Sequence, residues 1–384
     1  MKKYFYIGLF GLFVVEVLKG YLLMPMPGSQ EQNSVSLAYF LYDKRWLFRI
    51  LFMILILAGI KEAFQKRKWI PVVFLLIAAS GIYFSDFMMS AENMFHEPNT
   101  LAFKSGKENK LNDSSLVICV TYNGTSKAYP IQFLTFHHQV QDTIAEKAIM
   151  VTYCSVCRSG IVFEPIINGK KEKFRLVGMT HYNAMFEDYT TKSWWSQADG
   201  ICIAGPLKGK MLPYLSSSQM TIKKFSELYP NALIMQADPL YLAEYDTERV
   251  FEQGKITTGI ERTDTASWKA KSWVIGIELN KKSKAYDWNE LKAKRVINDN
   301  IELRGVVIAL AEDQQTYCAF ENPFYPMTGG ASDFTISHDT LFSNGRAYDF
   351  SGRDLEKSRE QLTAIPSKQE FWHSWKQFHP ATLN

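Results

Sequence analysis

The chain has 384 residues, of which 47% are hydrophobic, 21% charged and 14% aromatic. This composition excludes intrinsic disorder and collagen-like repeats, and five cysteines are too few for a disulfide-dense scaffold. The net charge of +4 is concentrated at the start, because residues 1–70 hold ten basic and four acidic residues, whereas the remainder holds 33 and 35. The positive charge accompanies a hydrophobic region, so we expect no nucleic-acid partner.

Three apolar stretches precede residue 90, at 4–24, 46–60 and 70–84. Spanning a bilayer takes about 20 residues, a length that the second and third stretches reach with their flanking aromatic residues. A cleaved signal peptide is the alternative for the first stretch, but Glu16 interrupts it and no small-residue cleavage site follows. We therefore predict a membrane anchor of three transmembrane helices in residues 1–90, with the lipid bilayer as the partner of residues 4–86.

The basic residues predict the orientation of this anchor. Lys2 and Lys3 precede the first stretch, and Lys61, Lys66, Arg67 and Lys68 lie between the second and third. Cytoplasmic loops carry an excess of such residues, so both sets should face the cytoplasm. Lys44, Arg45 and Arg49 oppose this order, although their long side chains can snorkel to the interface. We expect a protein of the bacterial inner (cytoplasmic) membrane with an extracytoplasmic soluble domain after about residue 86.

An internal repeat organises the soluble part. Residues 117–129 align without gaps with residues 274–286, and seven of the 13 positions are identical. The same offset of 157 residues pairs Asp142 with Asp299. A period of this length indicates a duplicated domain and not a solenoid.

Each copy reads as strands followed by an amphipathic helix, at 218–229 in the first copy and 368–378 in the second. The predicted fold class is α+β, with N-terminal transmembrane helices and a β-rich soluble domain of two pseudo-repeated lobes, each with a closing helix. The predicted boundaries are residues 91–236 for the first repeat, 237–272 for an aperiodic connection and 273–384 for the second repeat.

A CxxC motif, Cys154 and Cys157, follows a predicted strand of the first copy. Two such sulfurs can converge on one metal ion or cycle between dithiol and disulfide, which makes both residues candidates for a catalytic role. The second copy has Ala311 and Gln314 at these positions, so the shared scaffold does not require the cysteines. A structural disulfide and a pair of core cysteines remain the alternatives.

Two histidines of the same copy, His137 and His181, could complete a metal site. With Cys154 and Cys157 they form a ligand set suited to tetrahedral zinc or to thiophilic copper. His138 is adjacent to His137, and side chains of neighbouring strand residues point to opposite faces, so at most one of the two can be a ligand. For His181 a role as an ordinary loop histidine is the alternative.

A ligand pocket is also indicated, because two adjacent tryptophans lie near a glutamine and a Gly-Pro turn. The candidate ligand-binding residues are Arg158, Asn183, Trp194, Trp195 and Gln197. Arg158 could lower a thiol pKa or bind an anion. Either tryptophan could equally belong to the core.

These motifs together resemble a known family. TYCSVCRSG, VGMTHYNAMFED, TTKSWWSQADG and AGPLKG, in this order, are similar to the bacterial domain of unknown function 3179, and the membrane-spanning start is similar to members from Bacteroidetes. Many members have proline after the first cysteine, where this chain has Ser155. The resemblance implies a membrane or exported setting, and it implies no particular reaction.

The leading hypothesis is therefore a membrane-anchored extracytoplasmic protein with a Cys/His site for metal binding or thiol redox chemistry. The first alternative is a non-catalytic sensory or binding domain that holds a small-molecule ligand. The second is a membrane assembly factor that docks a membrane-protein partner through its spans.

Overall fold

The computed structural model describes residues 1–252, 262–280, 282–325, 333–356 and 360–384. The described chain divides into two compact units. The helical unit comprises residues 1–96, 173–196 and 201–211, and the β unit comprises residues 97–172, 197–200 and 212–384. Residues 173–196, predicted as part of the first repeat, thus belong to the unit that contains the N-terminal helices.

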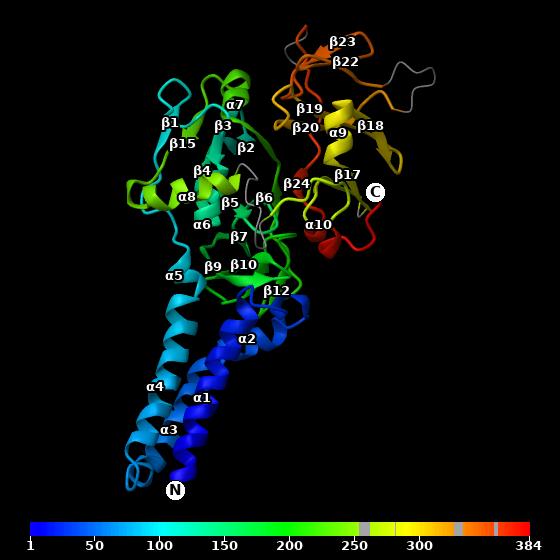
Figure 1. The fold of residues 1–384 in the computed structure, drawn as a ribbon. Coiled ribbons are helices and arrows are strands. Elements are labelled where there is room, and N and C mark those ends of the chain that lie inside the picture. The colour runs from blue at the N-terminus through cyan, green and yellow to red at the C-terminus, as the bar shows by residue number, and fades with distance from the viewer. Residues whose placement is uncertain (253–261, 281, 326–332, 357–359) are drawn as a thin grey trace. The chain divides into compact units, whose positions relative to one another are not determined.

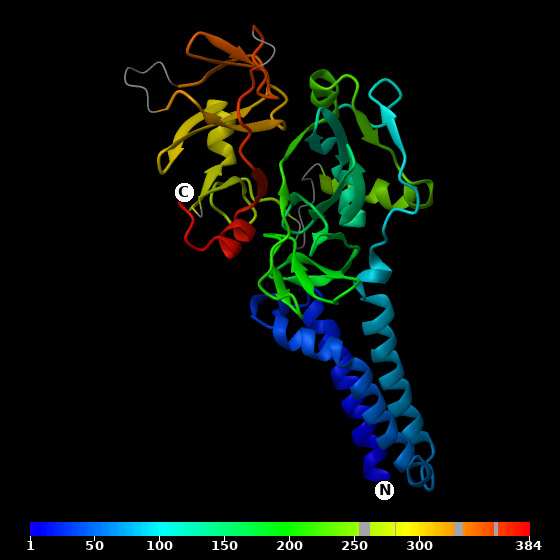
Figure 2. The same ribbon diagram turned by 180° about the vertical axis from the view of Figure 1, so that it is seen from behind.

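The helical unit begins with a bundle of long helices. Its helical segments are α1 (Lys2–Leu23), η1 (Ser29–Glu31), α2 (Val35–Asp43), α3 (Arg45–Ala63), α4 (Trp69–Tyr83), the π-helical turn η2 (Phe84–Met88) and α5 (Ala91–Met94). In both views α1, α3 and α4 run side by side (Figures 1 and 2). Within the described part of the chain, two helices, Lys2–Leu23 and Trp69–Met88, are long and apolar enough to cross a membrane.

Glycine allows α1 and α3 to cross closely. A Cβ atom on Gly59 would lie 2.5 Å from the Phe5 nitrogen, and one on Gly8 would lie 2.7 Å from the Phe52 carbonyl oxygen. Real Cβ atoms do not approach this closely, so both positions require glycine at this backbone separation. Phe5 and Ile56 fill the space beside the crossing as part of the buried core of the bundle.

A four-stranded antiparallel sheet completes the helical unit. Its strands are β9 (Phe174–Thr180), β10 (Asn183–Asp188), β11 (Trp194–Ser196) and β12 (Cys202–Ala204), in the order β12-β11-β10-β9. The end of α1 packs on this sheet through Leu22 and Leu23, which share a buried cluster with Val177 and Trp194.

The first half of the β unit, here called the first lobe, contains two larger sheets and the two-stranded sheet β7-β8. Its elements are β1 (Phe103–Ser105), β2 (Leu116–Tyr122), β3 (Thr125–Pro130), α6 (Ile131–His137), β4 (Gln139–Ile144), β5 (Lys147–Cys154), β6 (Ser159–Phe163), β7 (Ile166–Ile167), β8 (Lys170–Lys171), β13 (Tyr214–Leu215), β14 (Ser217–Thr221), α7 (Ile222–Leu228), β15 (Leu233–Met235), η3 (Pro239–Tyr241) and α8 (Leu242–Glu252). The sheet orders are β1-β15-β3-β2-β14 and β13-β6-β5-β4.

The second lobe contains three smaller sheets. Its elements are β16 (Trp273–Leu279), β17 (Lys282–Asp287), α9 (Trp288–Lys294), β18 (Val296–Ile301), β19 (Arg304–Leu310), β20 (Tyr317–Asn322), β21 (Thr335–Ser337), β22 (Thr340–Ser343), β23 (Arg346–Tyr348), β24 (Ser367–Phe371) and α10 (Trp372–Phe378). The sheet orders are β17-β16-β24, β18-β19-β20 and β21-β22-β23.

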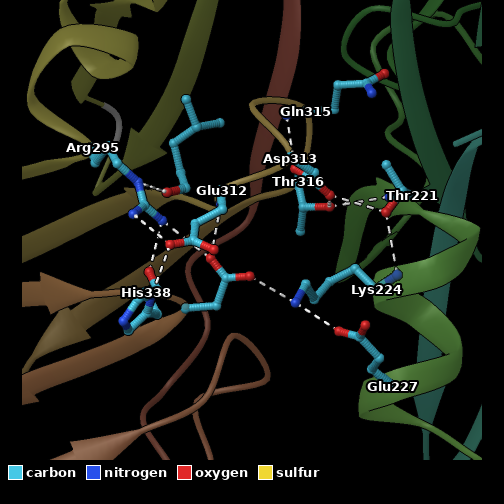
Figure 3. Close-up of polar contacts among 11 residues, drawn as sticks. Thr221, Lys224, Glu227, Arg295, Glu312, Asp313, Gln315, Thr316 and His338 are labelled. Atoms are coloured by element: carbon cyan, nitrogen blue, oxygen red, sulfur yellow. Dashed lines mark hydrogen bonds and ion pairs between the residues drawn. The ribbon is translucent and has the colours of Figure 1, made fainter.

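Corresponding elements of the two lobes have matching bounds. Each of β2, β3, α6 and β4 begins and ends 157 residues before β16, β17, α9 and β18, respectively. The lobes also contact each other through corresponding elements. Gln219 of β14 donates a hydrogen bond of 2.6 Å to Gln369 of β24, and the cap residue Thr221 of α7 contacts Asp313 and Thr316 in the β19–β20 loop (Figure 3).

Three local predictions differ from the structure. Residues 131–137 form α6 and not a strand, because Pro130 initiates a helix whose seven residues are all buried and show no amphipathic pattern. The predicted helices at 218–229 and 368–378 each begin as a strand and continue as the shorter helices α7 and α10. The predicted connection 237–272 contains η3 and α8, while residues 253–261 of it lie outside the described residues.

Candidate functional site

The CxxC motif forms the connection between β5 and β6 of the first lobe. Cys154 is the last residue of β5 and pairs with Ser159, the first residue of β6. Arg158 has a left-handed backbone with φ of +54°, which closes the turn. Cys154, Cys157 and Arg158 are all almost fully buried. The predicted placement of the motif at a strand end is therefore observed, but the turn lies in the protein interior.

The two thiols contact each other. Burial and a hydrogen bond to the Cys154 thiol raise the pKa of Cys157 well above its usual value. All five cysteines are buried thiols in this structure. Since the thiolate is the reactive form, Cys157 is held here as a protonated thiol of low nucleophilicity.

The second lobe holds the backbone of the CxxC turn. Phe371, at the end of β24, donates its N–H to the Cys157 carbonyl at 2.9 Å, and Lys271 Nζ donates to the Val156 carbonyl at 3.2 Å. The Arg158 guanidinium lies 5.3 Å from the ring centroid of Trp273 and 5.8 Å from that of Phe371. Such cation–π contacts suit a planar cation that is buried among aromatic rings.

Gln197 joins the two strands that carry the cysteines. Its amide Nε2 donates to Thr152 Oγ1 at 3.2 Å and to the Ser159 carbonyl at 3.0 Å, and its Oε1 accepts from Ser159 Oγ at 3.2 Å. Gln197 was predicted to bind a ligand, and in the structure its amide positions the base of the CxxC turn.

The histidines near the motif in sequence have other contacts. His137 ends α6, and its Nε2 lies 2.5 Å from the hydroxyl of Tyr245 in α8. His138 donates from Nδ1 to the Tyr153 carbonyl at 2.9 Å, and burial lowers the pKa of His138 to about 4. His181 belongs to the helical unit, where its Nε2 donates to Asn33 Oδ1 at 3.1 Å. The expected alternation of His137 and His138 on a strand is wrong, because His138 is the left-handed cap of a helix.

A metal centre is not assembled by the side chains that the structure describes. Among these residues no group of three or more His, Cys, Asp or Glu side chains is placed to hold an ion. Cys154, Cys157 and His137 belong to the β unit and His181 to the helical unit, so a metal site formed by this ligand set stays a prediction.

The comparison with protein families accounts for most of the chain. Residues 97–382 match the model of a protein family of unknown function, DUF3179. The chain belongs to the DUF3179 family. Neither a curated protein nor a solved structure matches it. The family match confirms the resemblance read from the motifs, and it covers both lobes of the β unit.

The paired tryptophans of this DUF3179 protein lie in the interior of the helical unit. Trp194 and Trp195 are 0% and 2% exposed, and their indole N–H groups donate to Glu187 and Asp188 at 3.0 Å each. Asn183 of β10 is also fully buried. A ligand role for these side chains stays a prediction, and it would require this core to open.

Lys271 and His373 lie beside the CxxC turn of this DUF3179 protein, and the sequence did not predict this. Lys271 donates to His373 Nε2 at 3.1 Å, and burial and the neighbouring ammonium lower the pKa of His373 to about 4. His373 is therefore neutral at physiological pH. Lys271 and His373 lie more than 100 residues after Cys157, and neither belongs to a motif that would indicate this contact.

Proposed function

We propose that this DUF3179 protein is anchored in the bacterial inner membrane by α1, α3 and α4, with its β unit outside the cytoplasm. The supporting observation is the exposure of large apolar side chains along the outward faces of these helices. They include Ile7, Phe10, Trp46, Leu47, Ile50, Ile54, Leu57, Val72, Phe74, Leu76 and Ile77. Water would disfavour so large an apolar surface, whereas lipid chains match it.

The orientation rests on charge. Lys61, Lys66, Arg67 and Lys68 lie at the end of the bundle that joins α3 to α4. A reporter enzyme that is active only outside the cytoplasm should be active when fused after Phe95 and silent when fused after Gln65. The opposite pattern would refute both the orientation and the oxidising setting that the thiol proposal assumes.

We propose further that Cys154 and Cys157 form a dithiol–disulfide couple. The observation that carries this proposal is the position of two buried thiols three residues apart in the tight connection between β5 and β6. The reaction is an exchange with a protein or small-molecule disulfide as oxidant. The two thiols lose two protons and two electrons to form one S–S bond, and the oxidant's S–S bond breaks to give two thiols.

The raised pKa of Cys157 makes this couple slow in the conformation described. Oxidation requires the turn to expose a sulfur and to release the contacts of Phe371 and Lys271 with its backbone. The oxidation state of the pair would therefore be coupled to the docking of β24 and α10 on the turn. This favours a redox-dependent structural role over rapid turnover.

Oxidised glutathione provides the test. The purified full chain should lose two hydrogen atoms by mass spectrometry, with the new disulfide mapped to Cys154 and Cys157. The Cys318→Ser variant, which removes an isolated buried thiol, should behave like the wild type. The Cys157→Ser variant should form no intramolecular disulfide. A stoichiometric zinc or copper ion that is lost only in Cys157→Ser would instead support metal binding.

A second candidate, ligand binding, has its own supporting observation in the β unit. A cavity of about 370 Å³ is lined by Trp273, Trp288 and several amide side chains, including Gln219, Gln314 and Gln369. Aromatic rings beside neutral amides suit an uncharged polar ligand. A change in tryptophan fluorescence on titration with soluble oligosaccharides, lost in Trp288→Ala, would support this candidate.

We also infer that the two lobes arose by duplication and later diverged in role. The matching element bounds and the contact of Gln219 with Gln369 support this inference. The first lobe would then carry the thiol chemistry, and the second would supply the strand and helix that hold the turn.

A further inference from the structure

A cluster of four charged residues lies within the helical bundle and has no part in the thiol proposal. Glu16 is fully buried in α1, and its carboxylate contacts Lys19 Nζ at 2.5 Å and Arg49 Nε at 2.6 Å. Asp86 in the π-helical turn η2 contacts the same two cations, at 2.6 Å from Lys19 and 2.5 Å from Arg49. Ionisable residues inside a membrane are costly, and they generally mark functional sites.

These charges lie at one end of the bundle. Lys19 is four residues before the end of α1, Arg49 is four residues after the start of α3, and Asp86 follows α4. With a rise of about 1.5 Å per residue, Lys19 lies about 25 Å along the helix from Lys2, which is close to the thickness of the hydrocarbon core. In the proposed orientation the cluster therefore lies at the level of the outer lipid headgroups.

A cavity of about 340 Å³ adjoins this cluster. Its polar lining includes Lys19, Arg49 and Asp86, together with Arg45 and Arg175, which come from α3 and β9. Further polar side chains, among them Ser85, Glu92 and Asn93, and the apolar side chains of Leu23, Met24, Phe87, Met89, Leu176 and Val177 complete the lining. A site with both characters suits a molecule that has a charged head and apolar chains.

The cations of the cavity differ in how fully they are neutralised. Lys19 and Arg49 are satisfied by Glu16 and Asp86. Arg175 is held by Glu187 at 2.6 Å and donates to the Tyr42 hydroxyl at 2.6 Å. Arg45 donates to the Tyr42 carbonyl at 2.6 Å, and it makes no ion pair with any residue that the structure describes. Arg45 is therefore the cation of this cavity that can form an ion pair with a bound anion.

Glu92 occupies the position where an external anion would bind. It contacts Arg175 from the short helix α5, and its side chain is 55% exposed. Glu92 is the exposed partner of this pair, and Arg175 keeps its ion pair with the buried Glu187, so a competing anion can displace the Glu92 carboxylate. Arg45 and Arg175 both line the cavity, so one anionic group that displaced Glu92 would meet two guanidinium groups.

We propose that this cavity binds the phosphate of an anionic phospholipid from the outer leaflet. Arg45 and Arg175 would receive the phosphate after Glu92 moves aside, and the acyl chains would continue along Phe87 and the exposed faces of the helices. A guanidinium group is well matched to a phosphodiester, and a headgroup without its own cation avoids repulsion from Arg45. This inference rests on the membrane anchoring proposed above.

The test measures the thermal unfolding midpoint of the full chain in a zwitterionic detergent. Short-chain phosphatidylglycerol should raise the midpoint in a concentration-dependent manner, because a ligand that binds only the folded state stabilises it. Phosphatidylcholine should raise it less, and glycerol phosphate at the same concentration should have no effect. Equal stabilisation by phosphatidylcholine, or by glycerol phosphate, would overturn the assignment to an anionic lipid.

Two variants should shift the lipid affinity in opposite directions. Arg45→Gln should weaken the apparent affinity about tenfold, the loss expected for one charge-assisted hydrogen bond. Glu92→Gln should strengthen it, because Arg175 no longer has a competing carboxylate. Arg67→Gln, which removes an exposed cation at the opposite end of the bundle, should bind like the wild type.

Wild-type affinity in Arg45→Gln, or weaker affinity in Glu92→Gln, would overturn the proposal. The unfolding midpoint of each variant without lipid shows whether it folds. Binding is measured in detergent, so its failure is distinguishable from a failure of the topology reporter. Cys157→Ser should leave lipid binding unchanged, which separates this site from the thiol pair.

Discussion

The two lobes of the β unit differ most at one loop. In the first lobe the loop between β5 and β6 carries Cys154 and Cys157, and its backbone is held from outside by Phe371 and Lys271 of the second lobe. The β19–β20 loop is held from within and from the first lobe, because Asp313 accepts the N–H groups of Gln315 and Thr316 at 2.9 and 2.8 Å and the hydroxyl of Thr221 at 3.0 Å. The two loops therefore differ mainly in the side chains that they carry, because Ala311 and Gln314 stand 157 residues after the two cysteines.

The docking of the lobes is reciprocal. The residue that caps α7, Thr221, donates its N–H to Thr316 in the loop of the second lobe at 3.1 Å. The residue that caps α10, Phe371, donates its N–H to Cys157 in the loop of the first lobe at 2.9 Å. The residue before α7 and the residue before α10 thus each contact the loop of the other lobe.

The largest loss of stability is expected from substitutions in the cores beneath the closing helices α7 and α10. Trp375 of α10 packs with Val274 and Ala285, and Phe225 of α7 packs with Val117 and Ala128, the equivalent pair. Both rings are 1% exposed, so Trp375→Ala and Phe225→Ala should each lower the free energy of unfolding by about 4 kcal/mol. Chemical denaturation of the full chain measures this. Unequal losses would show that the two helices are not equivalent supports.

A smaller loss of stability is expected when a small core residue of the second lobe is replaced by its larger counterpart from the first lobe. Gly276 lies where the first lobe has Cys119, and a Cβ atom at Gly276 would be 2.2 Å from the Trp375 ring. Gly276→Cys should therefore destabilise the protein by about 2 kcal/mol through overpacking. Adding Trp375→Phe, which copies the first lobe, should recover part of that loss. Additive costs in the double variant would contradict the structural equivalence.

The next effect depends on pH and concerns Asp299 of the second lobe. Burial would raise the pKa of Asp299, but the hydrogen bond from Lys284 at 2.6 Å and the backbone N–H of Asn300 outweigh it and hold this pKa below its usual value. A depressed carboxyl pKa contributes stability above the unfolded-state value of about 4, and the contribution is lost as the pH falls through the folded-state pKa. Asp299→Asn should remove about 1.5 kcal/mol at pH 7 and clearly less at pH 3, where the unfolded-state carboxyl is mostly protonated.

Chemical denaturation at pH 7 and pH 3 measures how the stability loss in Asp299→Asn depends on pH. The matched control is Asp299→Asn in a background that carries Lys284→Met, where the pH-dependent loss should be much smaller. A loss of equal size at pH 3 and pH 7 would mean that the carboxyl charge has no part in it.

The smallest effect is expected where the lobes meet. Gln219 and Gln369 share one hydrogen bond of 2.6 Å, so Gln219→Ala and Gln369→Ala should each cost about 1 kcal/mol. The double variant should cost less than the sum, because either change already removes the bond. Simple additivity would indicate that the contact does not join the lobes.

The sequence contained the signals for the apolar N-terminal helices, the offset of 157 residues and the CxxC turn, because each is a local pattern. It did not indicate α6, since every residue from Ile131 to His137 is buried and the helix has no polar face. The partner of His137, Tyr245, is 108 residues away in the chain, and the partners of the CxxC turn lie in the other lobe. Contacts of this kind depend on tertiary packing, which periodicity and spacing do not encode.

If α1, α3 and α4 span a membrane as proposed above, the close crossing at Gly8 and Gly59 constrains how they assemble in the bilayer. Arg49 of α3 would enter the lipid as a lone cation unless Glu16 of α1 were already beside it. The first two spans should therefore leave the insertion machinery as a pre-formed hairpin, with α4 and Asp86 added last. A side chain larger than hydrogen at Gly59 would separate the hairpin, and the expected consequence is a failure of membrane biogenesis before any failure of the folded protein.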